Sequence, residues 1–243
     1  LVTLLTITVN GLANALPLNG QGTGEISDRF EIYFVPAGYV FSIWGLIYLG
    51  LVAFTVYQAL PAQKDNQLLK KIYPAYWIGN LANAVWIFLW HYEVFALTLV
   101  AMLTILASLL HIYIQISNAG SRLDRNQKWF VKLPVSIYLG WISVATIANF
   151  TQVFFFFDWG GWGISSAIWA VIMLVVATVL GLLMQWRENN MAYVLVLVWA
   201  LIGIANSQAD TALVANTAWV TSALLVLAIV VVFFIRWRST QRA

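Results

Sequence analysis

The sequence predicts an all-α membrane protein, a polytopic bundle of about eight transmembrane helices, and three observations carry this prediction. The 243 residues are 62% hydrophobic and 9% charged, against about 45–50% and about 25% in an average soluble domain. The apolar residues form stretches of about 20, the length of helix that crosses a hydrocarbon core of ~30 Å. The charged residues lie between or at the ends of these stretches.

The apolar stretches define eight expected spans. Each is expected to be helical, because lipid cannot hydrogen-bond an open backbone. The first is short and begins at Leu1, and we interpret it as a clipped span rather than a signal peptide. The expected spans are 1–16, 38–60, 73–91, 94–117, 130–156, 162–185, 191–209 and 215–237.

The charges separate onto two sides of the expected bundle. One side carries one basic and six acidic residues, and the other carries eleven basic and three acidic residues. Basic residues near span ends mark the cytoplasmic side. We therefore expect an integral protein of a bacterial inner membrane, with both termini cytoplasmic and the loop 17–37 outside. Topology explains the basic residues, so no nucleic acid is expected as a partner. The glycine-rich stretch 20–24 is expected to be a flexible loop.

Several chemistries find no support in the residues. The chain has no cysteine, which excludes disulfides and thiolate chemistry. No catalytic motif is recognisable, so an enzyme is not expected. Every Asp, Glu, Lys and Arg lies at or beyond a span end, and the one histidine inside a span is His111. It is either hydrogen-bonded within the bundle or serves as an axial ligand for a tetrapyrrole metal. His91, at a span end, is expected at the membrane interface.

Aromatic and polar residues recur at helical spacing on four expected spans. Each such face admits two interpretations. The amides can hydrogen-bond between helices, or the faces can line a cavity that binds a flat hydrophobic molecule. The faces are Phe41, Trp44, Tyr48 and Thr55; Asn80, Asn83, Trp86 and Trp90; Pro134, Tyr138, Trp141, Ala145, Asn149 and Gln152; and Trp199, Gly203, Asn206 and Asp210.

Three of these faces resemble motifs of the translocator protein family, also called tryptophan-rich sensory proteins or peripheral benzodiazepine receptors. Residues 35–48 (VPAGYVFSIWGLIY) resemble the start of the family's second helix. Asn83 and Trp86 are similar to the Asn-x-x-Trp of its third helix. The fifth-helix pattern of Tyr, Trp, Ala-Thr and Asn is matched by Tyr138, Trp141, Ala145-Thr146 and Asn149, although the family's proline precedes the tyrosine directly and here stands at 134.

The resemblance implies a five-helix bundle over residues 1–156, with the outer loop 17–37, followed by three additional helices and a basic tail over 157–243. It also implies a pocket for a porphyrin, another tetrapyrrole or a carotenoid, with no obligatory cofactor, and dimers are common in the family. The implied ligand-binding residues are Phe41, Trp44, Tyr48, Asn83, Trp86, Tyr138, Trp141, Ala145 and Asn149.

Two further functions stay open. The protein could be an accessory subunit of a larger, pigment-bearing membrane complex, with the last three spans as a docking surface. It could also be a small-molecule transporter. Transporters commonly use broken helices near the membrane centre, and Asn10-Gly11 and Pro134 are candidate breaks, although no charged residue lies there.

Overall fold

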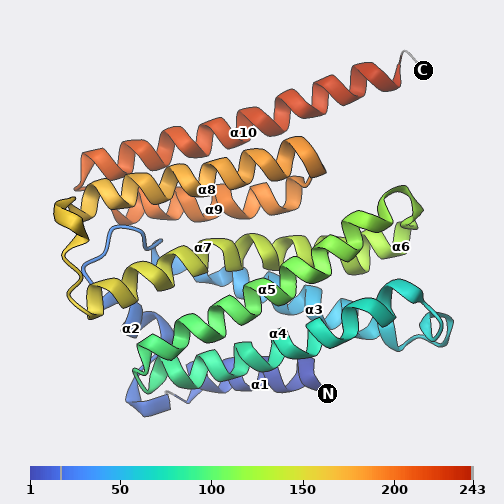
Figure 1. Ribbon diagram of the computed structural model, residues 1–243, viewed down its shortest axis with the longest axis horizontal. Coiled ribbons are helices and arrows are strands. Elements are labelled where there is room, and N and C mark those ends of the chain that lie inside the picture. The colour runs from blue at the N-terminus through green and yellow to red at the C-terminus, as the bar shows by residue number, and fades with distance from the viewer. Residues whose placement is uncertain (17, 242–243) are drawn as a thin grey trace. The chain divides into compact units, whose positions relative to one another are not determined.

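The computed structural model describes residues 1–16 and 18–241, and Arg242 of the expected basic tail lies outside them. Each expected span contains one long helix, and no strand occurs in this part of the chain. The all-α prediction is therefore confirmed (Figure 1). The long helices are α1 (Val2–Ala15), α3 (Ile43–Ala59), α4 (Gln67–His91), α5 (Phe95–Ala119), α7 (Leu133–Phe156), α8 (Ser166–Glu188), α9 (Met191–Ser207) and α10 (Ala212–Thr240), with the short α2 (Thr23–Asp28) and α6 (Arg125–Gln127) between them.

Five segments are long and apolar enough to cross a membrane by themselves: Gly38–Ala59, Phe95–Arg122, Arg125–Phe156, Ser166–Glu188 and Ala212–Arg238. Val2–Ala13 and Met191–Ser207 are apolar but shorter. Leucine, valine and phenylalanine side chains are exposed along most of these helices, as at Leu49 (70%) and Phe233 (64%). Exposing so much apolar surface to water is unfavourable, whereas the hydrocarbon of a lipid bilayer can surround it.

Of the two candidate helix breaks, the first does not occur, because α1 runs without interruption through Asn10 and Gly11. The second coincides with a local departure from α-helical geometry. Pro134 follows a π-helical turn at Lys128–Lys132 inside the continuous helical segment Arg125–Phe156, and proline and π-helical turns are both common causes of helix kinks.

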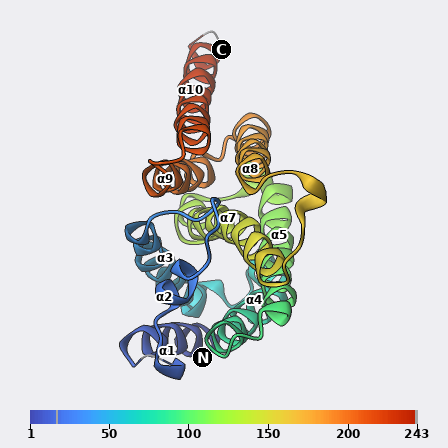
Figure 2. The same ribbon diagram turned by 90° about the vertical axis from the view of Figure 1, so that its left-hand side faces the viewer.

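The chain divides into two compact units. The N-terminal unit comprises residues 1–31 and 42–158, and the C-terminal unit comprises 32–41 and 159–243. In the N-terminal unit α4 packs along α5, α5 along α7, α1 along α4, and α3 along α7. Figure 2 shows these five helices arranged around a common interior, with α2 lying across one end.

Small residues allow the close helix crossings of the N-terminal unit. A Cβ atom added to Gly79 on α4 would lie 3.0 Å from the Ser108 Cβ on α5. One added to Gly50 on α3 would lie 3.0 Å from the Pro134 Cβ on α7. Close backbone approach of this kind is how membrane helices gain packing energy in a solvent as apolar as their own side chains.

In the C-terminal unit α8, α9 and α10 pack side by side (Figure 1), and residues 32–41 lie along α9. The Ala37 N–H donates to the Gly203 carbonyl at 3.1 Å, and the Trp199 indole donates to the Val40 carbonyl at 3.1 Å. The Asn206 amide donates to the Tyr39 hydroxyl at 2.8 Å. The expected face of Trp199, Gly203 and Asn206 on this helix thus binds a segment of the chain itself.

Candidate functional site

Four aromatic side chains on α3 and α7 form one cluster in the N-terminal unit, and we call them the aromatic cluster. Trp44 stacks on Tyr48 with ring centroids 5.5 Å apart. It also meets the edges of Tyr138 at 5.9 Å and Trp141 at 6.2 Å. Edge-to-face and offset contacts are the favoured aromatic geometries. The helical spacing places each pair on one face, and the packing of α3 on α7 joins the two faces.

The amide of Asn83 connects this cluster to α1. Its Nδ2 donates to the Tyr138 hydroxyl at 2.9 Å, and its Oδ1 accepts from Asn10 Nδ2 at 2.7 Å. Asn83 is 1% exposed and Asn10 3% exposed. Asn10 is a residue that sequence reasoning missed as part of the site. Its only signal was a lone amide in an apolar helix.

A second group of predicted residues lies further along the same faces of α4 and α7. The Trp86 indole donates to Asn149 Oδ1 at 3.1 Å, and Asn149 Nδ2 donates to the Thr98 hydroxyl at 2.9 Å. Trp86 also stacks on Trp90 at 5.0 Å. Thr98 on α5 had no sequence signal, because a single threonine in an apolar helix ordinarily bonds its own backbone.

Eight of the nine predicted residues therefore lie in the N-terminal unit, on the packed faces of α3, α4 and α7. Half-buried Ala145 stands on α7 between Trp141 and Asn149. Phe41 belongs to the segment 32–41 of the C-terminal unit. The Asn83 and Asn149 side chains form hydrogen bonds between helices, which is one of the two interpretations of the sequence. The aromatic rings on the neighbouring faces of α3 and α7 contact one another.

Residues 18–31 close one end of the N-terminal unit (Figure 2). We call them the outer cap, after the side of the membrane on which the charge pattern leads us to expect them. The stretch expected to be a flexible loop begins α2 at Thr23, so that expectation is wrong. The apolar side of α2 fills the end of the bundle, where Ile26 packs with Trp90, Phe95 and Val153.

Polar contacts tie the outer cap to the ends of α4 and α7. His91 Nδ1 donates to the Ile87 carbonyl at 2.8 Å, and its Nε2 lies 3.3 Å from the Thr23 hydroxyl. Ser27 accepts from Gln152 at 3.1 Å, and Arg29 pairs with Glu93 at 2.7 Å. The Arg29 guanidinium lowers the pKa of the Glu93 carboxyl. His91 is fully buried under the cap rather than facing the membrane interface as expected.

A small cavity lies next to the aromatic cluster, lined by residues of α3, α4, α5 and α7. Its volume is about 20 Å³, close to that of one water molecule, and its lining is almost entirely apolar. Tyr138 is shared between this cavity and the aromatic cluster. The Asn80 Oδ1 atom in the cavity wall has no hydrogen-bond partner among the described residues.

His111 does not lie inside the bundle, so the interpretation of an internally hydrogen-bonded histidine is wrong. It is exposed on α5 and lines an open groove between α4 and α5. Within residues 1–16 and 18–241, no three His, Asp or Glu side chains come together as a metal site.

A protein-family model described as TSPO-like protein matches residues 1–231. The chain belongs to this family. The TSPO-like match runs past residue 156, the end of the stretch whose motifs carry the resemblance, and includes α8, α9 and most of α10. With the membrane-spanning helices, it makes the chain an integral membrane protein of the TSPO type. No curated protein and no solved structure matches the sequence.

Proposed function

We propose that this TSPO-type protein binds a flat apolar molecule of the tetrapyrrole class between α3, α4 and α7 of its N-terminal unit. The observation that carries the proposal is the aromatic cluster next to the paired amide of Asn83. Indole and phenol rings can stack on a planar ligand. A small number of placed polar groups can then bond its edge and set its orientation.

The ligand must displace contacts that the side chains now make with one another. Binding sites for ligands of this size measure about 300–1,000 Å³, whereas the small cavity beside Tyr138 holds about 20 Å³. The rings of Trp44 and Trp141 must therefore separate, and Asn83 must exchange one of its partners for the ligand. Binding by this route is an induced opening whose rate depends on how easily the outer cap and α3 move.

Titration with metal-free protoporphyrin in detergent, followed by porphyrin absorbance and tryptophan fluorescence, tests the proposal. Trp141→Ala removes a cluster ring and is expected to weaken binding at least tenfold. Trp129→Ala is the matched control, because Trp129 lies in the same unit and is 59% exposed, and it is expected to bind like the native protein.

The melting temperature of each variant separates lost binding from lost folding. If Trp141→Ala fails to fold, half-buried Trp44 offers Trp44→Leu as the second variant. Native affinity in a folded Trp141→Ala or Trp44→Leu protein contradicts the proposal.

A further inference from the structure

Residues 32–41, which we call the strap, connect the outer cap to α3 but belong to the C-terminal unit. The chain therefore leaves the N-terminal unit after residue 31, lies along α9, and returns to the N-terminal unit at Ser42. The next helix, α3, carries Trp44 and Tyr48 of the aromatic cluster. The strap thus joins the C-terminal unit, through the chain itself, to the helix that carries half of this cluster.

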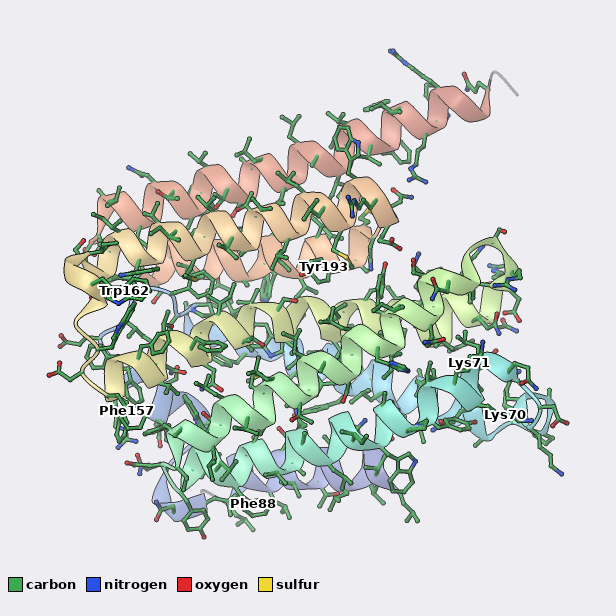
Figure 3. The ribbon with its side chains drawn as sticks, in the orientation of Figure 1. Lys70, Lys71, Phe88, Phe157, Trp162 and Tyr193 are labelled. Carbon is green, nitrogen blue, oxygen red and sulfur yellow. The ribbon has the colours of Figure 1, made fainter. Side chains whose placement is uncertain are left out.

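One face of α9 holds the strap. It is formed by Trp199, Gly203 and Asn206, whose spacings of four and three residues place them on the same side of a helix. Each takes part in a hydrogen bond to the strap, at 2.8–3.1 Å. Two of these bonds use backbone groups of the strap, so they depend on its path and not on its side chains. The face lies in the second half of α9, away from Tyr193 in the first turn (Figure 3).

Close packing adds to these hydrogen bonds. Val40 is fully buried and lies against the bare backbone at Gly203. A Cβ atom added at Gly203 would lie 3.4 Å from the Val40 Cβ and 3.1 Å from the Pro36 Cβ. Tyr39 meets the edge of Trp199 with ring centroids 5.3 Å apart. Only glycine at position 203 allows the strap to lie this close to α9.

The end of the strap is a helical turn that continues into α3. Residues Gly38–Ser42 form a 3₁₀-helix, and α3 follows at Ile43, so that Gly38–Ala59 is one helical segment. A 3₁₀-helix has poorer hydrogen-bond geometry than an α-helix, and 3₁₀ turns inside a longer helix often mark hinges. Because the two helices are continuous, a movement of the 3₁₀ turn is passed to the first turn of α3, which carries Trp44.

We propose that the strap is a conformational switch through which the C-terminal unit controls the start of α3. While α9 holds the strap, the first turn of α3 is restrained and Trp44 stays in contact with Tyr138 and Trp141. When the strap leaves α9, α3 moves more easily and the aromatic cluster opens more often. The consequence for ligand entry rests on the proposed function, which requires these rings to separate, whereas the control of α3 does not.

An engineered disulfide tests the proposal within one molecule. The chain has no cysteine, so the variant that combines Val40→Cys with Gly203→Cys contains a single possible pair. The 3.4 Å between the two Cβ positions is close to the range of about 3.5–4.5 Å in natural disulfides. Oxidation locks the strap to α9, and reduction removes the lock without a change of sequence.

Two measurements read the state of the switch. Hydrogen exchange of the amides of residues 43–48, in detergent and without ligand, reports the control of α3 and is expected to be several-fold slower in the oxidised protein than in the reduced one. The association rate of metal-free protoporphyrin, followed by tryptophan fluorescence, is expected to be several-fold lower in the oxidised protein. Gly203→Ala is expected to raise both rates. Gly160→Ala is the matched control in the same unit, because nothing lies within 4 Å of a Cβ at Gly160, and it should keep both native rates.

Trp199→Phe is the second releasing variant, in case Gly203→Ala does not fold. It removes the indole donor to the Val40 carbonyl and keeps a ring against Tyr39. Exchange at residues 43–48 is expected to be faster than in the native protein. Trp219→Phe is the matched control, because this indole on α10 is 47% exposed, and it should exchange at the native rate.

The proposal is overturned if exchange at residues 43–48 is the same in the oxidised and the reduced protein. Loss of porphyrin binding in Trp141→Ala would in that case still support the proposed function. If the native protein binds no porphyrin but its exchange depends on the disulfide, the proposed function fails and the control of α3 by the strap is supported. Disulfide-dependent exchange with an unchanged association rate would overturn the link between α3 and ligand entry.

Discussion

Asn83 on α4 donates its amide hydrogen to the hydroxyl of Tyr138 on α7 at 2.9 Å, 55 positions apart in the chain. Through Asn10 the same amide reaches α1, so one buried side chain joins three helices. In lipid no water is available to replace a lost partner. This link therefore holds the aromatic cluster in place and also positions the polar group that a ligand would meet.

Replacing Asn83 by Ala is expected to lower the stability of the protein by about 1–3 kcal/mol, because the buried Asn10 amide and the Tyr138 hydroxyl lose a partner. Unfolding in detergent measures the loss. A double-mutant cycle with Tyr138→Phe should give a coupling free energy between the two side chains of about 0.6 kcal/mol, and no more than about 1.7 kcal/mol. Additive effects of the two substitutions would mean that the bond contributes nothing.

Replacing Trp86 by Phe is expected to cost about 1–3 kcal/mol, since the Asn149 Oδ1 atom loses its indole donor. Much of the stacking on Trp90 survives, because the phenylalanine ring remains. Trp77→Phe is the matched control on the same helix, where the indole is 48% exposed, and it should leave the melting temperature unchanged. Equal effects of the two variants would argue against the hydrogen bond.

Replacing Gly203 by Ala is expected to destabilise the C-terminal unit by about 1–3 kcal/mol. The added Cβ would overlap the Val40 side chain and lie 3.1 Å from the Pro36 Cβ, which pushes residues 32–41 away from α9. Proteolysis of that segment and thermal unfolding both report this change.

Gly45→Ala is the control for that substitution. Nothing lies within 4 Å of a Cβ at Gly45, and alanine in a helix is favoured over glycine by roughly 0.5–1 kcal/mol. Gly45→Ala is therefore expected to be neutral or stabilising. If Gly203→Ala is also neutral or stabilising, Val40 does not pack tightly against Gly203 of α9 in the purified protein.

The ion pair between Arg29 and Glu93 predicts a pH dependence of the outer cap. Arg29 lowers the pKa of Glu93, so the stabilisation is complete above the ordinary glutamate pKa and disappears as the pH falls through the lowered value. Both side chains are partly exposed, at 45% and 37%, and the contribution is about 0.2–1 kcal/mol.

Protease cleavage within residues 18–31 should therefore increase at acidic pH and at high salt, which screens exposed charges. Glu93→Gln is expected to show the increased cleavage already at neutral pH, with little further change on acidification. An unchanged pH profile in Glu93→Gln would mean that the Arg29–Glu93 pair does not cause the acid sensitivity.

The positions of the helices could be predicted from the sequence because the signals are local. About 20 apolar residues in a row determine a span whatever its neighbours are. The period of 3.6 residues also placed Trp44 with Tyr48, and Tyr138 with Trp141, on common faces. Helix α2 was missed, because a six-residue helix at Thr23–Asp28 depends on the apolar contacts of Ile26 with α4, α5 and α7.

The sequence by itself determined that this protein is a bundle of membrane helices, and which side chains share a helix face. Only the tertiary structure decided where each face points: Asn83 toward Tyr138, His111 outward into a groove, and Trp199 toward Val40, 159 positions away. The reason is that in lipid both faces of an apolar helix are tolerated, so its rotation is set by close packing and buried hydrogen bonds with distant helices.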